Sequence, residues 1–186
     1  EVRIFGADRA AHPPVAGVVL HGPSAWSCAH GVERWRSDCG DSTGGHQGWN
    51  QKWRAPLREA LDLVKKNVDE HYFKAGERFF NEPRAALLAF GKVIADPSYA
   101  GAFMDEHFKE AAREGQGEGV AWLLLRMQEH ALASYASCAW FFDEISRIEP
   151  VNAMRFALLA MEVMEVTGGP AIQEQFEYIL EKAVSN

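Results

Sequence analysis

The sequence lacks any apolar run long enough to cross a membrane. A membrane-spanning helix needs about 20 consecutive apolar residues, and no run of that kind occurs in the 186-residue chain. No secretory signal precedes Glu1, so we expect a soluble cytoplasmic protein. Because the first residue is not Met, we also expect the chain to be a fragment of a larger polypeptide.

Cysteine and positive charge are both in short supply. The three cysteines, Cys28, Cys39 and Cys138, are an odd set without the density of a disulfide framework, which indicates reduced thiols. Lys and Arg number 19 against 26 Asp and Glu, giving a net charge of -7. An acidic surface repels phosphate groups, so the composition excludes nucleic acid and anionic membranes as expected partners.

Internal repeats and low-complexity tracts are absent, so the sequence indicates one domain overall. Its composition changes near residue 50. Residues 1–22 contain two short β-like runs, 1–5 and 15–20, and 23–50 form a loop rich in Gly, Trp, Cys and His. Residues 51–186 are dense in Ala, Leu, Glu, Lys and Met, which lose little side-chain freedom in a helix.

Residues 51–186 predict an all-α fold, an antiparallel bundle of five or six helices with short connections. In the first helix Leu57, Leu61, Val64 and Val68 recur at three to four residues, which marks one buried face. Pro83 opens the second helix at a favoured position. The expected spans are 51–74, 83–95, 98–113, 119–146, 149–166 and 170–184.

The loop at 23–50 is too aromatic for a disordered segment, and its residue types suit carbohydrate binding. Flat indole rings cover the apolar faces of a sugar, and polar side chains bond its hydroxyls. The loop supplies Trp26, Trp35 and Trp49, interleaved with His30, Arg34, Asp38, His46 and Asn50.

Three alternatives for this loop remain open. Cys28, His30, Cys39 and His46 have the residue types of a zinc site, although their spacing matches no common zinc motif. Cys28 with His30 could form a reactive thiol. The loop could also be structural, with Trp35 and Trp53 packed on the bundle and Trp26 or Trp49 facing a cleft.

Asp143 and Glu144 are adjacent carboxylates at the end of the fourth expected helix. Glycosidases use two carboxylates about 5–10 Å apart, on either side of the sugar. Neighbouring helical residues point in directions about 100° apart, so this pair cannot straddle a ligand. We expect a solvated or salt-bridged helix end and no catalytic residue.

Two strings resemble a known domain: WSCAHGVERWRSDCG at 26–40, which continues as STGGHQGWNQKWRAPLR at 42–58, and SCAWFFDEIS at 137–146. They are similar to the helical domain of unknown function that follows the catalytic domain in glycoside hydrolase family 57-type proteins. The resemblance covers 24–164. Asp41 stands where relatives often have a further cysteine, which weakens the metal alternative, and Ala139 and Arg147 replace glycines.

This resemblance implies a role in carbohydrate metabolism. The related enzymes are amylases, glucanotransferases and branching enzymes, whose Glu nucleophile and Asp acid/base lie on a preceding catalytic barrel. That barrel is absent here, so we expect an accessory domain of a hydrolase that is not catalytic alone. Its partners would be the barrel of the same polypeptide and an α-glucan, with no cofactor and no metal.

By the same resemblance, the loop at 23–50 is the part that could reach the substrate cleft. The substrate-binding residues it implies are Trp26, His30, Arg34, Trp35, Asp38, His46 and Trp49. A purely structural or oligomerising helical domain with no ligand is the alternative.

Overall fold

The computed structural model describes residues 22, 25 and 27–185, and this part of the chain is all helical. The α-helices are α1 Arg54–Phe79, α2 Pro83–Ala95, α3 Ala100–His107, α4 Glu110–Arg113, α5 Gly117–Ala133, α6 Ile148–Val166 and α7 Gln173–Leu180. Three short 3-10 helices are η1 Glu33–Trp35, η2 Pro97–Tyr99 and η3 Ser137–Trp140. The prediction of an all-α bundle is confirmed. The β-like runs at 1–5 and 15–20 lie outside the described residues.

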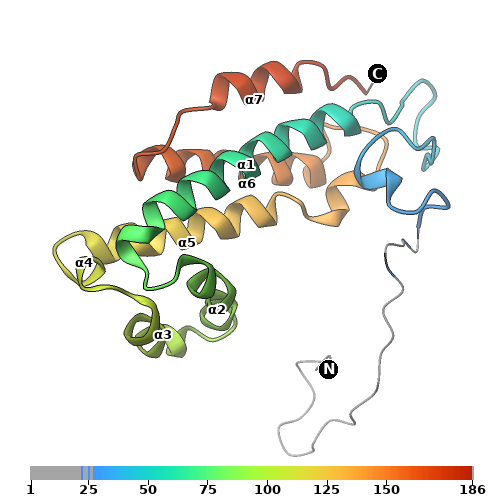
Figure 1. The fold of residues 1–186 in the computed structure, drawn as a ribbon. Helices are drawn as coiled ribbons and strands as arrows, with labels where there is room; N and C mark the ends of the chain where they lie inside the picture. The colour runs from blue at the N-terminus through green and yellow to red at the C-terminus, as the bar shows by residue number, and fades with distance from the viewer. Residues whose placement is uncertain (1–21, 23–24, 26, 186) are drawn as a thin grey trace, which may run out of the picture.

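Helices α1, α5, α6 and α7 lie side by side as an antiparallel bundle (Figure 1). The short helices α2, α3 and α4 gather at the end of the bundle where α1 finishes. The loop that precedes α1 lies at the opposite end, beside the segment that joins α5 to α6. Two stretches about 100 residues apart therefore meet at one end of the molecule.

The core is built on the predicted stripe of α1. Leu57, Leu61, Val64 and Val68 are all fully buried, together with Tyr72 one turn later. Fully burying an aliphatic side chain of this size stabilises a fold by about 1.5–3 kcal/mol. This face fixes α1 as the central helix of the bundle.

A pair of tryptophans ties the loop end of α1 to the α5–α6 connection. The rings of Trp53 and Trp140 are stacked, with centroids 6.3 Å apart and planes 8° apart. Both are buried, at 0% and 1% exposure. The expected packing of Trp53 is confirmed, and Trp35 is half-buried against the same core.

The fourth predicted helix was wrong at its C-terminal end, because α5 stops at Ala133 instead of continuing to Ser146. The buried Ser134 hydroxyl donates to the Ala131 carbonyl at 2.7 Å, a bond that competes with the helical ladder. The chain then forms η3 and turns Trp140 into the core. Packing of this aromatic segment overrides its helical pattern.

Three other predicted helices differ from the structure at their boundaries. The first was predicted at 51–74 and spans Arg54–Phe79. The third helix is broken at Phe108, which forms an isolated antiparallel bridge with Phe80, supported by a 2.8 Å bond from the Lys109 N–H to the Phe79 carbonyl. The last helix is confined to α7 and does not begin at Pro170.

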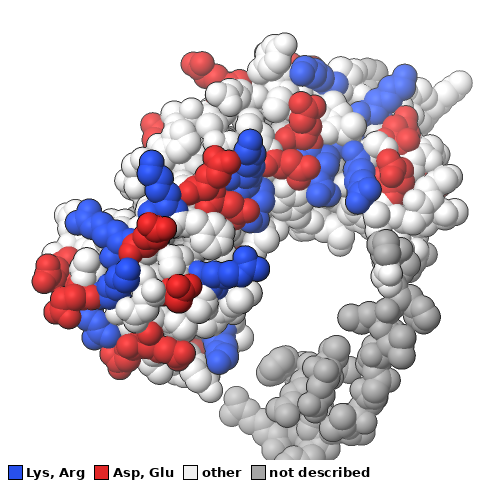
Figure 2. Space-filling view, in the orientation of Figure 1, with Lys and Arg blue, Asp and Glu red and all other residues white. Residues whose placement is uncertain are grey.

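No helix in the described part has the length and apolarity to cross a membrane. The face of the molecule seen in Figure 2 carries acidic and basic side chains interspersed, with no continuous field of one sign. The negative net charge is therefore not gathered into one patch on this face.

Candidate functional site

The loop that precedes α1 is anchored to the bundle through one carboxylate. Asp143, only 2% exposed, accepts hydrogen bonds from the Ser42 hydroxyl, the Thr43 hydroxyl and the Thr43 N–H, each at 2.8 Å. The Gln51 amide donates to its other oxygen at 2.9 Å. Asp143 thus holds three positions of the loop at once.

The same bonds keep Asp143 ionised. Burial alone would raise the pKa of this carboxyl, but the hydrogen bonds from Thr43, Ser42 and Gln51 outweigh it and lower the pKa below its ordinary value. The expectation of a solvated or salt-bridged helix end was wrong for Asp143. It is a buried, hydrogen-bonded anchor, because the helix ends ten residues earlier.

Two buried arginines add to the anchor. Arg34 donates to the Phe141 carbonyl and Arg54 to the Phe142 carbonyl, both at 3.3 Å. Burial lowers the pKa of Arg54. The carbonyls that these guanidinium groups bond belong to the turn just before Asp143, so the loop and the α5–α6 connection form one interlocked unit.

A compact cluster of two thiols, an imidazole and a carboxylate lies within this unit. The potential ligand atoms of Cys28, His30, Cys39 and Asp41 all lie within 4.8 Å of one another. His30 Nδ1 is 3.9 Å from Cys28 Sγ and 3.7 Å from an Asp41 oxygen. Cys28 is buried, whereas the His30 side chain is 56% exposed.

The two arginines also border this cluster. Arg34 lies 3.6 Å from the Asp41 carboxylate, and Arg54 donates to Cys39 Sγ at 3.5 Å. Burial raises the pKa of the Cys39 thiol. The neighbouring Cys28 thiol is the largest cause of a lowered pKa of Asp41. The surroundings therefore favour a negative charge on the carboxylate.

A second feature of the loop is a pair of rings. His46 and Trp49 lie with ring centroids 4.3 Å apart and planes inclined by 38°. His46 is exposed and Trp49 is half-buried. The pair offers solvent an exposed imidazole ring beside a half-buried indole ring.

The other sequence-predicted site residues are divided among different roles. Trp26 lies outside the described residues. Arg34 is buried, and Trp35 donates its indole N–H to the Ser137 carbonyl at 3.3 Å, so both serve packing. Asp38 is exposed and accepts from the Gly40 N–H at 3.0 Å. Of the four residues predicted as possible zinc ligands, Cys28, His30 and Cys39 lie together, and Asp41 is the fourth member of their cluster. His46 lies instead against Trp49.

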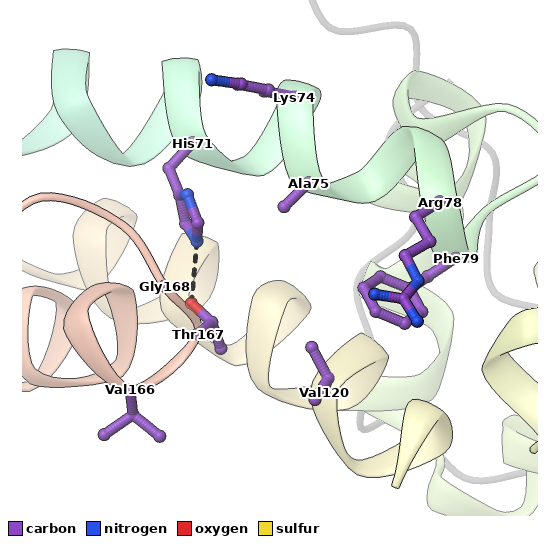
Figure 3. Close-up of a pocket in the computed structure, with 9 residues that line it drawn as sticks. All are labelled: His71, Lys74, Ala75, Arg78, Phe79, Val120, Val166, Thr167 and Gly168. Atoms are coloured by element: carbon purple, nitrogen blue, oxygen red, sulfur yellow. Dashed lines mark hydrogen bonds between the residues drawn. The ribbon is translucent and has the colours of Figure 1, made fainter. Parts of the chain in front are cut away.

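A separate pocket of about 510 Å³ lies between α1, the start of α5 and the α6–α7 turn (Figure 3). His71 points from α1 toward Thr167, with its Nε2 2.9 Å from the hydroxyl. Burial lowers the pKa of His71. Lys74 and Arg78 line the same pocket.

This pocket was not predicted from the sequence. The signal was present, since His71, Lys74, Ala75 and Arg78 recur at three and four residues along one face of a helix. That face alone could not reveal the pocket, because its opposite wall comes from Val120 and from the 166–168 turn.

Residues 49–186 match the family model of a domain of unknown function (DUF3536). The chain belongs to this family. No curated protein and no solved structure matches it. The DUF3536 region contains the whole helical bundle, including Asp143 and both carbonyls bonded by the arginines. The four-residue cluster lies before the matched region.

Proposed function

We propose that this chain is an accessory domain of a carbohydrate-active enzyme of the glycoside hydrolase family 57 type. Its loop would help to shape the α-glucan cleft of a catalytic barrel in the same cytoplasmic polypeptide. Support comes from the strings that carry the resemblance. The stretches 27–40 and 42–58 lie against 137–146, joined through Asp143 and Arg34.

The observation that carries the proposal is the anchored loop with its partly exposed pair of rings, His46 and Trp49. A sugar-binding surface must keep its rings in place before the ligand arrives, since ordering them on binding lowers affinity. The bonds of Asp143 fix Thr43 and Gln51, on either side of His46 and Trp49. The pair is thus held between two fixed points.

A surface of α6 is suited to contact with the barrel. Ile148, Phe156, Leu159 and Val166 are exposed at 66%, 37%, 41% and 77%. Exposed apolar side chains that recur along one helix are typical of protein contacts. The proposal of a catalytic barrel in the same polypeptide is tested by the coding sequence upstream of Glu1. A barrel with a suitably placed Glu and Asp supports it, and an unrelated upstream sequence contradicts it.

Sugar binding is tested by titrating the chain with maltohexaose, followed by calorimetry and tryptophan fluorescence. We expect Trp49→Ala to weaken binding about tenfold, equivalent to about 1.4 kcal/mol. The matched control is Tyr99→Ala, which removes a 52% exposed ring from η2, between α2 and α3. That variant should bind as the wild type does.

Two results would contradict the sugar proposal. One is equal loss of binding in Trp49→Ala and Tyr99→Ala. The other is an altered molecular mass of Trp49→Ala in light scattering with no effect on the sugar, which would make the loop an assembly surface.

A further inference from the structure

We propose that Cys28, His30, Cys39 and Asp41 bind one zinc ion that clamps the two arms of the loop together. The site uses Asp41 in place of His46 as its fourth ligand. It does not depend on the sugar proposal, and metal binding is measured without any sugar present.

The geometry is close to that of a bound ion. Zinc bonds of about 2.0–2.3 Å place tetrahedral ligand atoms roughly 3.3–3.8 Å apart. The distances from His30 Nδ1 to Cys28 Sγ and to Asp41, 3.9 and 3.7 Å, are nearly within that range. For a pair of atoms at the 4.8 Å limit, a contraction of about 1.0–1.5 Å would give the spacing of zinc ligands.

The backbone presents the ligands as two short arms. Cys28 and His30 are separated by one residue, and so are Cys39 and Asp41. Gly40, between the second pair, has a φ of +76°, a left-handed conformation that side-chain-bearing residues rarely adopt. The turn at Gly40 brings Cys39 and Asp41 to the same point.

Unsatisfied polar atoms surround the cluster. One oxygen of Asp41 is buried and makes no hydrogen bond of ordinary length, although Arg34 lies 3.6 Å and His30 3.7 Å from it. The Nε atoms of Arg34 and Arg54 are also buried and make no hydrogen bond. Buried polar atoms are normally bonded, so such a gathering needs an explanation. A metal bond would satisfy the Asp41 oxygen. Ionised thiols on the metal would place negative charge beside both guanidinium groups.

The donor set selects zinc and a structural role. Thiolate, imidazole and carboxylate together suit zinc, and four protein ligands leave no open position for a substrate. The ion would join the arm at Cys28 and His30 to the arm at Cys39 and Asp41, which Arg54 ties to the bundle. Zinc would thereby extend the anchored unit toward the N-terminal side of the loop.

The test is a titration of the chelator-treated, reduced chain with Co²⁺ and then Zn²⁺. One equivalent of Co²⁺ should give a thiolate charge-transfer band and tetrahedral d–d bands, and one equivalent of Zn²⁺ should abolish them. Loss of a residue that only hydrogen-bonds a metal ligand lowers metal affinity about 10- to 100-fold. Cys39→Ser and His30→Ala each remove a ligand itself, so each should lower the affinity for zinc by more than about 100-fold. Asp41→Cys, which supplies a third thiolate, should bind more tightly.

Matched controls are Cys138→Ser, an exposed thiol outside the cluster, and His46→Ala, the other imidazole of the loop. Both should bind one equivalent with wild-type affinity. Circular dichroism establishes that each variant is folded. If a variant fails to fold, the site is tested in the wild type by the reaction of its three cysteine thiols with a disulfide reagent. Zinc should then protect two of the three thiols, Cys28 and Cys39, from the reagent.

The proposal is overturned if folded wild type binds less than one equivalent. It is equally overturned if Cys138→Ser or His46→Ala weakens binding as much as Cys39→Ser. A failure of zinc to protect two thiols contradicts it as well, and would indicate a thiol pair open to oxidation instead.

Discussion

Asp143 is the residue on which the position of the loop depends most. Both of its oxygens accept hydrogen bonds, one from Gln51 and the other from Ser42 and Thr43. No neutral side chain of the same shape can reproduce this, because every neighbour is a donor. The charge of Asp143 is therefore as important as its size.

We expect Asp143→Asn to lower the free energy of unfolding by about 2–3 kcal/mol, the value of hydrogen bonds to a buried charge. In either orientation the new amide group would face a donor. Urea unfolding followed by circular dichroism measures the change. Glu144→Gln is the matched control. This half-buried carboxylate accepts a hydrogen bond from the nearby Ser146 N–H. Glu144→Gln should therefore lower the free energy of unfolding by less than about 1 kcal/mol. Equal losses would contradict the anchor role.

The lowered pKa of Asp143 also predicts a pH dependence. The carboxyl has a lower pKa in the folded chain than the value of about 3.9 expected when it is unfolded. Its stabilisation is thus present above about pH 4 and is lost as the pH falls through the folded pKa. The difference in unfolding free energy between wild type and Asp143→Asn should narrow as the pH is lowered from 7 to 3. A constant or widening difference would refute this prediction.

At the scale of elements, the junction of α4 and α5 depends on a close backbone approach. A Cβ added to Gly117 would lie 2.1 Å from the Ala111 carbonyl oxygen and 3.1 Å from the Ala112 Cα. Backbone atoms cannot move aside as a flexible side chain can. The first residue of α5 must therefore be glycine for α4 to pack against it.

We expect Gly117→Ala to lower the free energy of unfolding by about 1–3 kcal/mol, the usual effect of overpacking. Gly119→Ala, in the same helical turn, has nothing within 4 Å of its new Cβ. It should be neutral or stabilising by up to about 1 kcal/mol, because alanine favours helices. Thermal unfolding of the two variants compares them directly. The opposite order would contradict the packing at this junction.

For the whole molecule, the Trp53–Trp140 stack and the Asp143 bonds make the loop part of the cooperative unit. We expect urea unfolding followed by tryptophan fluorescence to coincide with unfolding followed by circular dichroism. Fluorescence reports partly on Trp35 and Trp49 of the loop, while circular dichroism reports on the helices. Trp49→Phe should change the fluorescence amplitude and leave the midpoint in place. An early fluorescence transition would mean that the loop unfolds alone.

How far the sequence predicts the structure depends on how local the cause is. The α1 stripe and the Pro83 start of α2 are confirmed, because spacing along one helix fixes which side chains face the core. The end of α5 was wrong, because packing of Trp140 outweighs local propensity. Within the loop, residue type identified three members of the cluster. The fourth member is Asp41 and not His46, because a turn at Gly40 that the spacing alone did not reveal brings Asp41 to the cluster.

The sequence by itself determined a helical bundle with a Trp-, Cys- and His-rich loop before it, since propensity and periodicity act over a few residues. Only the tertiary structure decided what the loop rests on. The bonds between Thr43 and Asp143 join positions 100 residues apart. No local pattern specifies such a pairing, because it forms only when α1, α5 and α6 have packed and brought both segments to one end of the bundle.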